Sequence, residues 1–350
     1  MVVEPESLCW VTGREVRSRD GETWAEEFRS LPALEYVVTD AGSGLSKGLR
    51  LLGQERPGVR HGLDVFHTFR EGNTALRKSY GRVSRAIEQA ERKQKELDWL
   101  KRHGRSREGK GVHAKRSWQT AERLLDQAAA AEAAWKRVRE ALDLFTPDGK
   151  LQGREQAEAL VAEALPKLVG AEWGKTIRLL KRSETFAFLE RGREQLSALG
   201  LPEETLQALL ELEGFRHRPA LLRGEDRAAG AARGLLIART VQLEKSHADW
   251  REKAKAVRQA LRRAWRASSL VEGVNSVARM QQARHRRMTR GLLDLKRFYW
   301  NLRRFRTGRR RGKRPYELLG LNLPQSDWWQ FLKLTPGQLA QHLSAKPDTS

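Results

Sequence analysis

The feature that most constrains the fold is a run of roughly 190 residues, from about residue 69 onward, in which helical patterns follow one another without a strand signal. These residues are rich in Ala, Leu, Glu, Lys, Arg and Gln, and their apolar positions recur at intervals of three and four residues. Glycine- and proline-containing breaks fall near 104–111, 147–149 and 200–202. The expected helical segments are 69–102, 113–144, 153–170, 173–198 and 225–262.

The first 67 residues follow a different pattern, in which strand-like and helix-like segments alternate. Strand-like runs cover 2–11, 34–39 and 59–67, and short helices are expected near 23–29 and 45–52. Such alternation is typical of an α/β unit with a mixed sheet. The sequence therefore predicts an α/β unit that a large all-helical insertion interrupts, in a chain that is mostly helical overall.

The charge of the chain indicates a polyanionic partner. The 350 residues include 67 Lys and Arg against 44 Asp and Glu, a formal net charge of +23. Residues 251–320 carry 22 basic and 4 acidic side chains, so most of the excess lies in one fifth of the chain. Nucleic acid is the first candidate for a partner of such a segment. Because the segment also contains Trp265, Phe298 and Trp300, we expect a folded basic surface rather than a disordered tail.

Composition also excludes several classes of protein and site. A single cysteine, Cys9, permits neither an internal disulfide nor a zinc site built from thiolates. No run of about 18 consecutive apolar residues indicates a membrane span. We therefore expect no membrane partner and a cytoplasmic, nucleoid-associated location. The expected organisation is an α/β part at 1–67, a helical insertion at 68–250, a basic part at 251–320 and a tail at 321–350.

Two acidic residues occupy positions that suit chemistry. Asp40 ends an apolar strand just before a glycine-containing turn, and sites in open sheets are built at the carboxyl ends of strands. The alternative for Asp40 is a turn or helix-capping role. Glu272 shares one helical face with Asn275, Ser276 and Arg279, at the start of the basic segment. Its alternative is a capping box with Ser269.

The basic segment supplies candidate phosphate contacts, which bind DNA without reading its sequence. The candidates, all polar or positively charged, are Asn275, Arg279, Arg284, Arg286, Arg287, Arg290, Arg303, Arg304, Arg306, Arg309, Arg310 and Arg311. Between them, Met288, Leu292, Leu295, Tyr299 and Leu302 form an apolar stripe that predicts the buried face of a helix.

Several of these segments resemble one family. Residues 268–276 (SSLVEGVNS), 298–305 (FYWNLRRF) and 312–320 (GKRPYELLG) resemble the C-terminal end of insertion-sequence transposases of the DDE type. Residues 36–45 (YVVTDAGSGL) look like the second catalytic strand and turn of that family. Asp64 and His67 are similar to a motif of Asp or Cys, two residues and His that many of these enzymes carry just downstream. The matches cover about 140 residues in the family's order, and the helical middle looks like the insertion of some members.

The resemblance implies an RNase H-like catalytic core and two-metal chemistry. Asp40 and Glu272 would be two of its three metal-binding carboxylates, with two Mg²⁺ ions, or Mn²⁺, as the cofactors. The implied reaction is phosphodiester hydrolysis and strand transfer at the ends of an insertion sequence. The implied partner is double-stranded DNA, at the element ends and the target, bound by a homodimer when the protein is active.

The chain departs from the family pattern at the first catalytic aspartate. That residue belongs on a strand upstream of a segment like 2–11, and the only aspartate before Asp40 is Asp20, which adjoins a turn at Gly21. The usual upstream DNA-binding module has no counterpart either. We therefore expect a partial core without its first strand, in an N-terminally truncated transposase that binds DNA and has little or no strand-transfer activity.

Two further interpretations compete with this one. The chain is also compatible with a non-catalytic, helix-rich nucleic-acid-binding protein in which the acidic residues are structural. Asp64 and His67 could form a metal pair by themselves, although two ligands at this spacing are a weak signal. Their alternative is a strand-end aspartate that hydrogen-bonds a histidine.

Overall fold

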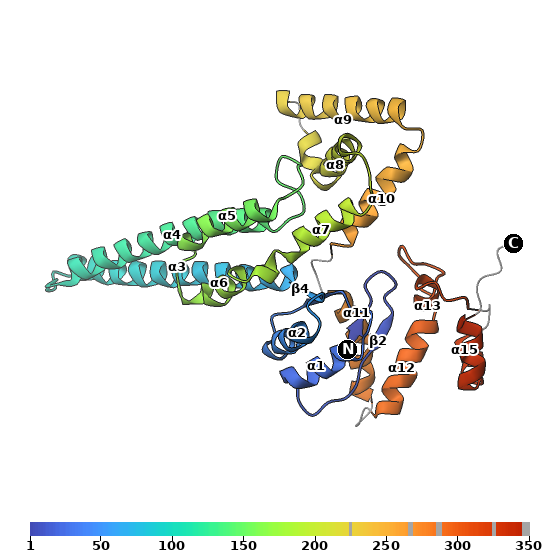
Figure 1. Ribbon diagram of the computed structural model, residues 1–350. Helices are drawn as coiled ribbons and strands as arrows, with labels where there is room; N and C mark the ends of the chain where they lie inside the picture. The colour runs from blue at the N-terminus through green and yellow to red at the C-terminus, as the bar shows by residue number, and fades with distance from the viewer. Residues whose placement is uncertain (224–225, 265–268, 285–288, 324–326, 345–350) are drawn as a thin grey trace. The chain divides into compact units, whose positions relative to one another are not determined.

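The computed structural model of the chain describes residues 1–223, 226–264, 269–284, 289–323 and 327–344. These residues are mostly helical, with two separate two-stranded sheets (Figure 1). The chain forms two compact units and passes between them several times. Unit 1 comprises 1–33, 43–56 and 267–350, and unit 2 comprises 34–42 and 57–266. The mostly helical character expected from the sequence is confirmed, and the RNase H-like core stays a prediction.

Unit 1 combines a short antiparallel sheet with helices from both ends of the chain. Strands β1 (Val2–Val3) and β2 (Trp10–Thr12) pair in the register Val2 to Thr12 and Val3 to Trp10. The helices of the unit are α1 (Gly21–Arg29), α2 (Ser43–Glu55), α11 (Ser269–Arg284), α12 (Arg290–Leu302), α13 (Pro315–Leu318), α14 (Trp328–Phe331) and α15 (Pro336–Ser344). Helices α1 and α2 pack on each other, and α11 and α12 contact the sheet.

The two ends of the chain are held together by hydrogen bonds from α12 to the start of β2 and the residues just before it. The Asn301 side chain accepts a hydrogen bond from the Trp10 amide at 2.9 Å and donates one to the Trp10 carbonyl at 3.0 Å. The Trp300 indole donates to the Leu8 carbonyl at 2.8 Å. Around them, Trp10, Val274 and Trp300 form a small buried apolar cluster. Because these partners satisfy buried backbone groups, they fix which face of α12 is turned inward.

The buried face of α12 differs from the predicted stripe. Leu295 is 41% exposed and Tyr299 37% exposed, whereas Trp300, Asn301 and Leu302 are buried. The prediction that Leu295 and Tyr299 are buried is therefore wrong. The helix is oriented instead by hydrogen bonds between Trp300 and Asn301 and the N-terminal segment. Met288, the first residue of the predicted stripe, lies outside the described residues.

Unit 2 begins with a two-stranded parallel sheet. Strands β3 (Tyr36–Thr39) and β4 (Arg60–Leu63) pair from Tyr36 opposite Arg60 to Thr39 opposite Leu63. The α-helices that follow are α3 (Val65–Arg102), α4 (Lys110–Ala141), α5 (Arg154–Ala164), α6 (Gly174–Leu180), α7 (Ala187–Ser197), α8 (Glu203–His217), α9 (Arg227–Ser246) and α10 (Trp250–Arg262). Short 3₁₀ turns η1 (Leu165–Lys167), η2 (Ala171–Trp173), η3 (Ser183–Thr185) and η4 (Pro219–Leu222) connect several of them.

Helices α3 and α4 lie side by side as a long hairpin, whose turn is the loop 103–109 (Figure 1). Alanines line much of the buried face of α4, and Gly72 of α3 lets the Trp135 ring approach the α3 backbone closely. Trp135 and Trp173 belong to the main core of the unit, and both are almost fully buried. No helix in the described part of the chain is both long enough and apolar enough to cross a membrane.

Several predicted boundaries are corrected by the structure. The expected strand 2–11 is two short strands, separated by a turn in which the Glu4 carboxylate accepts the amides of Glu6 and Ser7. The expected strand 59–67 ends at Leu63, and helix α3 begins at Val65. Helix α8 lies outside the helical segments expected from the sequence. The strand expected at 59–67 ends early because the Asp64 side chain caps α3 where the strand was expected to continue.

Candidate functional site

The carboxyl ends of β3 and β4 bring Asp40 and Asp64 to the same edge of the parallel sheet. Asp40 follows Thr39 and Asp64 follows Leu63, and these two strand residues are register partners. The Asp64 amide donates to the Thr39 carbonyl at 2.8 Å, which extends the ladder to the edge itself. Parallel strands place their carboxyl ends together, so two short strands suffice to align the aspartates.

Asp40 is exposed and forms a turn with the residues that follow it. Its Oδ1 accepts the Gly42 amide at 3.1 Å, and its carbonyl accepts the Thr39 hydroxyl at 2.8 Å. This is the turn role that the sequence left open as an alternative. No described residue bonds to its Oδ2. One carboxylate oxygen of Asp40 therefore faces solvent and has the hard oxygen character that a divalent cation prefers.

Asp64 and His67 have a different arrangement. The Asp64 side chain is buried, and its Oδ1 accepts the amides of Phe66 at 2.7 Å and His67 at 3.3 Å, which makes it the N-cap of α3. The His67 Nε2 lies 3.7 Å from the Asp64 Oδ2. Asp64 therefore both follows the end of β4 and caps α3, and its carboxylate lies within ion-pair distance of the His67 ring.

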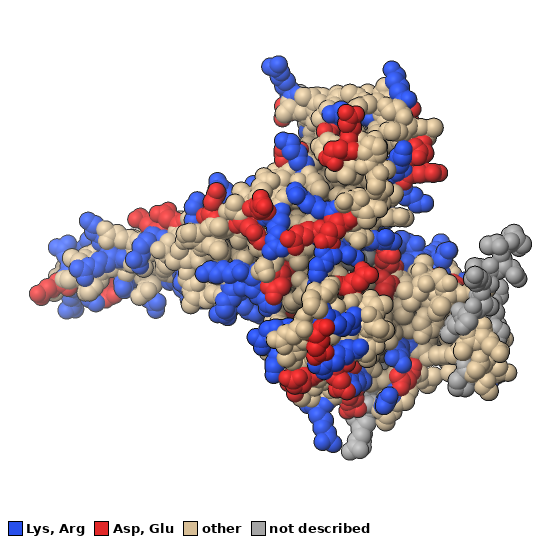
Figure 2. Space-filling model, in the orientation of Figure 1, with Lys and Arg blue, Asp and Glu red and all other residues tan. Residues whose placement is uncertain are grey.

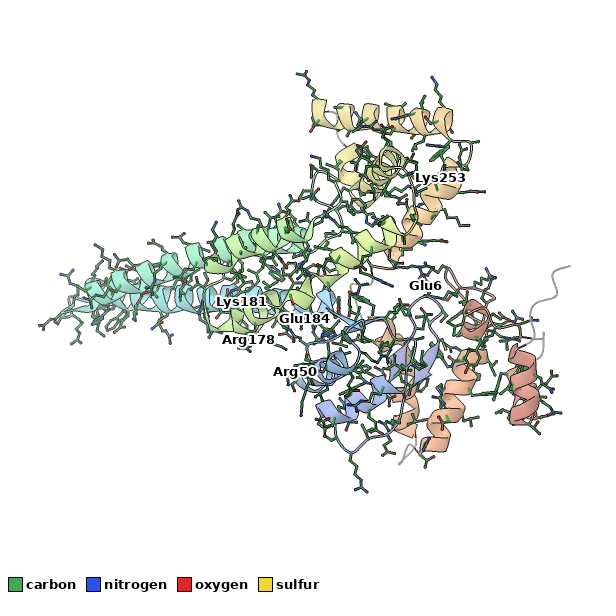
Figure 3. The ribbon with its side chains drawn as sticks, in the orientation of Figure 1. Glu6, Arg50, Arg178, Lys181, Glu184 and Lys253 are labelled. Carbon is green, nitrogen blue, oxygen red and sulfur yellow. The ribbon has the colours of Figure 1, made fainter. Side chains whose placement is uncertain are left out.

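Beside the sheet lies a half-buried polar cluster that the sequence did not single out. His61 on β4 bonds to the Thr39 hydroxyl through Nε2 at 2.8 Å, and its Nδ1 lies 3.9 Å from Glu184 Oε1. Burial lowers the pKa of His61 to about 4, against the opposing effect of Glu184. Glu184 belongs to η3, close after the exposed Arg178 and Lys181 of the α6 region (Figure 3). The sequence signal for this cluster was His61 itself, a titratable side chain beside a glycine in the expected strand 59–67.

Tyr36 and Arg191 form a second half-buried contact beside the sheet. The Arg191 guanidinium lies 5.6 Å from the centre of the Tyr36 ring, and burial raises the pKa of the Tyr36 hydroxyl. The Tyr36 hydroxyl occupies the space that a side chain at Gly62 would need, because an added Cβ would lie 2.3 Å from it. This packing explains the glycine in β4 and fixes the strand against α7.

Glu272 lies in unit 1, on the exposed side of α11. Asn275 is half-buried, Ser276 and Arg279 are exposed, and Val274 is the residue of this turn that enters the core. The Ser276 hydroxyl bonds back to the Gly273 carbonyl at 2.8 Å. The shared polar face expected from the sequence is therefore present on one helix. The side chain of Ser269, and with it the alternative of a capping box, lies outside the described residues.

The candidate arginines of unit 1 fall into two groups. Arg303 lies 3.9 Å from the centre of the Trp300 ring, Arg304 donates to the Gly312 carbonyl at 2.6 Å, and Arg310 donates to the carbonyls of Pro5 and Glu6 at 2.7 Å each. Burial lowers the pKa of the Arg303 and Arg310 guanidinium groups. These three arginines therefore hold the unit together, a role that a charge count does not reveal.

The second group faces solvent. Arg306, Arg309 and Arg311 are exposed, and no carboxylate of the described residues pairs with them. Arg290 is 91% exposed, with Asp294 at 3.9 Å. Gly308 and Gly312 have positive φ and shape the loop that presents these side chains. Arg286, Arg287 and the side chain of Arg284 lie outside the described residues.

The described residues bring together some predicted site residues and leave others in separate units. Asp40, Asp64 and His67 share unit 2, whereas Glu272 and the candidate DNA contacts belong to unit 1. Within the described part of the chain, no three His, Cys, Asp or Glu side chains are close enough to hold a metal ion together. No protein-family model, curated protein or solved structure matches the chain.

Proposed function

We propose that the chain binds double-stranded DNA as a transposase of the DDE type, with Asp40 and Glu272 as metal-binding carboxylates of an RNase H-like centre. The observation that carries DNA binding is the exposed loop of unit 1 with Arg306, Arg309 and Arg311, whose charges no described carboxylate neutralises. Phosphate groups would supply the missing counter-charge, and the binding would be sequence-independent and sensitive to salt.

The carboxylates fit the cofactor in chemistry. Asp40 offers a solvent-facing oxygen at the carboxyl end of a parallel strand, and Glu272 lies on an exposed helical face with Asn275 and Arg279 nearby. Bound Mg²⁺ ions would polarise a phosphodiester and stabilise the charge of in-line displacement. Asn275 and Arg279 would position the DNA backbone beside that centre. A homodimer on paired ends is part of the same proposal.

We expect weak or undetectable cleavage from this chain. Asp20, the one aspartate before Asp40, is the N-cap of α1 and accepts the Thr23 amide at 2.9 Å, so it is committed to the helix end. Two assigned carboxylates instead of three would bind metal poorly. Supercoiled-plasmid nicking in Mg²⁺ and in Mn²⁺ tests this, with Asp40→Asn as the control. Robust cleavage that Asp40→Asn abolishes would contradict the expected shortage of ligands.

The DNA-binding part has its own test. Fluorescence anisotropy with a labelled blunt duplex would compare the chain with the triple variant Arg306→Gln, Arg309→Gln, Arg311→Gln. Loss of three phosphate contacts should reduce the slope of log affinity against log salt by about 2.7. Arg123→Gln, Lys136→Gln, Arg139→Gln is the matched control, because these α4 residues are exposed and also unpaired among the described residues. Equal slopes in both variants would contradict the assigned surface.

One set of contacts favours a non-catalytic nucleic-acid-binding protein as the second candidate. Asp40 and Asp64 each accept backbone amides, which gives both a structural role without any metal. Mn²⁺ titration followed by electron paramagnetic resonance separates the two candidates. The transposase proposal expects weak Mn²⁺ binding that Asp40→Asn and Glu272→Gln each reduce. DNA binding that needs no metal, together with Mn²⁺ binding that neither variant changes, would favour the second candidate.

A further inference from the structure

The α3–α4 hairpin carries a line of positive charge that the proposed function does not use. Lys78, Arg85, Arg92 and Trp99 follow one another at intervals of seven residues along α3. We call these four residues the α3 stripe. Since seven residues are close to two helical turns, they lie along nearly one face, and by 1.5 Å per residue they extend over about 31 Å.

The charges of the α3 stripe are exposed and unpaired among the described residues. Lys78, Arg85 and Arg92 are exposed, and no described carboxylate lies within ion-pair distance of them. Thr74, Arg77 and Gly81 complete an open hollow with Lys78 and Arg85. A side chain added at Gly81 would meet nothing within 4 Å, so the hollow opens to solvent. Figure 2 shows Lys and Arg side chains over much of the hairpin surface.

The stripe ends at a basic tip with an exposed aromatic ring. Residues 99–116 carry seven basic side chains and one acidic one. Lys101 pairs with Asp98 and Lys110 with Glu96, whereas Arg105, Arg107, Lys115 and Arg116 pair with no described carboxylate. The first turn of α4, at the same tip, contains no acidic residue. The positive charge at this end of the hairpin is therefore left for an external anion to neutralise.

Trp99 adds a contact that a surface for phosphate alone would not need. Its side chain is 48% exposed, and its ring stacks on His103 with centres 4.4 Å apart and planes 25° apart. His103 is held in place by a contact between its Nδ1 and the Trp99 carbonyl at 2.8 Å. A large aromatic ring that is supported on one side and exposed to solvent beside basic residues suits stacking on an unpaired base.

We propose that the α3 stripe and the hairpin tip form a second DNA-binding surface, which takes duplex DNA with a single-stranded extension. Lys78, Arg85 and Arg92 contact the phosphates of the duplex, and Trp99 stacks on an unpaired base next to it. The length of the stripe is close to one turn of DNA. This inference rests on the proposed DNA partner, but it requires neither the carboxylates nor the arginine loop of unit 1.

The phosphate contacts are tested by removing positive charges in one variant and a negative charge in another. Lys78→Gln, Arg85→Gln, Arg92→Gln should reduce the salt slope for a labelled blunt duplex by about 2.7, in the full-length chain. Glu88, an exposed residue one turn beyond Arg85, allows the opposite test, because Glu88→Gln should tighten binding. The matched control is again Arg123→Gln, Lys136→Gln, Arg139→Gln. Circular dichroism would verify that the helical content of every variant is unchanged.

The aromatic contact is tested by comparing a blunt duplex with the same duplex carrying a short single-stranded extension. Trp99→Leu should weaken binding of the extended DNA roughly ten-fold and leave the blunt duplex nearly unchanged, whereas Trp99→Phe should retain most of the preference. An equal effect of Trp99→Leu on both DNAs, or no effect on either, would overturn the stacking contact.

The outcomes separate this inference from the proposed function. If the α3 stripe variant binds like the original chain while the Arg306, Arg309 and Arg311 variant loses affinity, the second surface is wrong and the first stands. If the reverse holds, the hairpin is the DNA-binding surface and the assignment in unit 1 is wrong. Unchanged binding in both variants would overturn both surfaces.

Discussion

At the scale of single residues, His61 gives unit 2 a dependence on pH. Its folded-state pKa of about 4 lies below the ordinary value of 6.5, so between these values the unfolded chain binds a proton that the folded chain does not. The stability that depends on a neutral His61 is therefore fully present above about pH 6.5 and is lost as the pH falls toward 4. The full loss attributable to His61 is about 3 kcal/mol.

The measurement is urea unfolding at pH 7 and pH 4.5 for the chain and for His61→Gln. Gln does not titrate and keeps a polar partner for the Thr39 hydroxyl, so the variant should lose about 2–3 kcal/mol less than the original chain on acidification. His113→Gln, which removes an exposed histidine of α4, is the control. An identical loss for His61→Gln and the original chain would show that His61 is not held neutral in the fold.

The same scale shows what the sequence could predict about the candidate site. The positions of Asp40 at a strand end and of Glu272 on a polar helical face could be predicted. Both depend on sequence patterns that extend over only a few neighbouring residues. The roles of Arg310 and Asn301 could not be predicted, because their partners lie about 290 to 305 positions away in the sequence. An arginine that binds backbone carbonyls and one that awaits a phosphate have the same local sequence signal.

At the scale of elements, two glycines of α3 should respond in opposite ways to the same substitution. A Cβ at Gly72 would lie 2.2 Å from the Trp135 ring, whereas a Cβ at Gly81 would meet nothing within 4 Å. Gly72→Ala should therefore destabilise unit 2 by about 1–3 kcal/mol through overpacking. Gly81→Ala should stabilise it by about 0.5–1 kcal/mol, because alanine restricts the unfolded chain and favours helix.

Thermal unfolding followed by circular dichroism at 222 nm measures both changes, and each variant is the control for the other. A loss of stability from Gly81→Ala would mean that α3 is not continuous at that turn. An unchanged midpoint for Gly72→Ala would mean that α3 and α4 are not held together at Trp135. The Trp135 indole also donates to the Asn73 side chain at 2.9 Å, which limits how far the ring can move away.

Element boundaries show where the sequence patterns lose their power. Long helices such as α3 and α4 were predictable, because many residues repeat the same spacing and glycines mark the turn between them. The end of β4 could not be predicted, because the local sequence around Asp64 is compatible both with a continuing strand and with a helix cap. The strand 2–11 was wrong because the Glu4 side chain satisfies turn amides that a continuous strand would have paired across a sheet.

At the scale of the whole molecule, the partition into units could not be predicted from the order of segments. The sequence suggested contiguous parts at 1–67, 68–250, 251–320 and 321–350, whereas the compact units divide the first 67 residues between them. Strands β3 and β4 group with the helical segment because β4 contacts α7 and η3 and β3 pairs with β4. Such grouping depends on side chains such as Tyr36 and Arg191, which contact each other across more than 150 positions.

The net charge of +23 predicts how salt acts on the whole chain. Without DNA, like charges repel in the folded state, and the Debye length falls from about 30 Å at 0.01 M to about 10 Å at 0.1 M salt. The unfolding midpoint should therefore rise by a few degrees between these concentrations. Exposed ion pairs such as Arg29 with Glu55 oppose this trend, but each contributes little.

With duplex DNA present the sign should reverse. DNA stabilises the folded state at low salt by binding to it, and this stabilisation disappears as salt weakens the phosphate contacts. Differential scanning calorimetry over a salt series, with and without DNA, measures both trends. The two curves should converge at high salt, where DNA no longer binds. A midpoint that falls with salt in the absence of DNA would mean that ion pairs outweigh the repulsion of the excess positive charge.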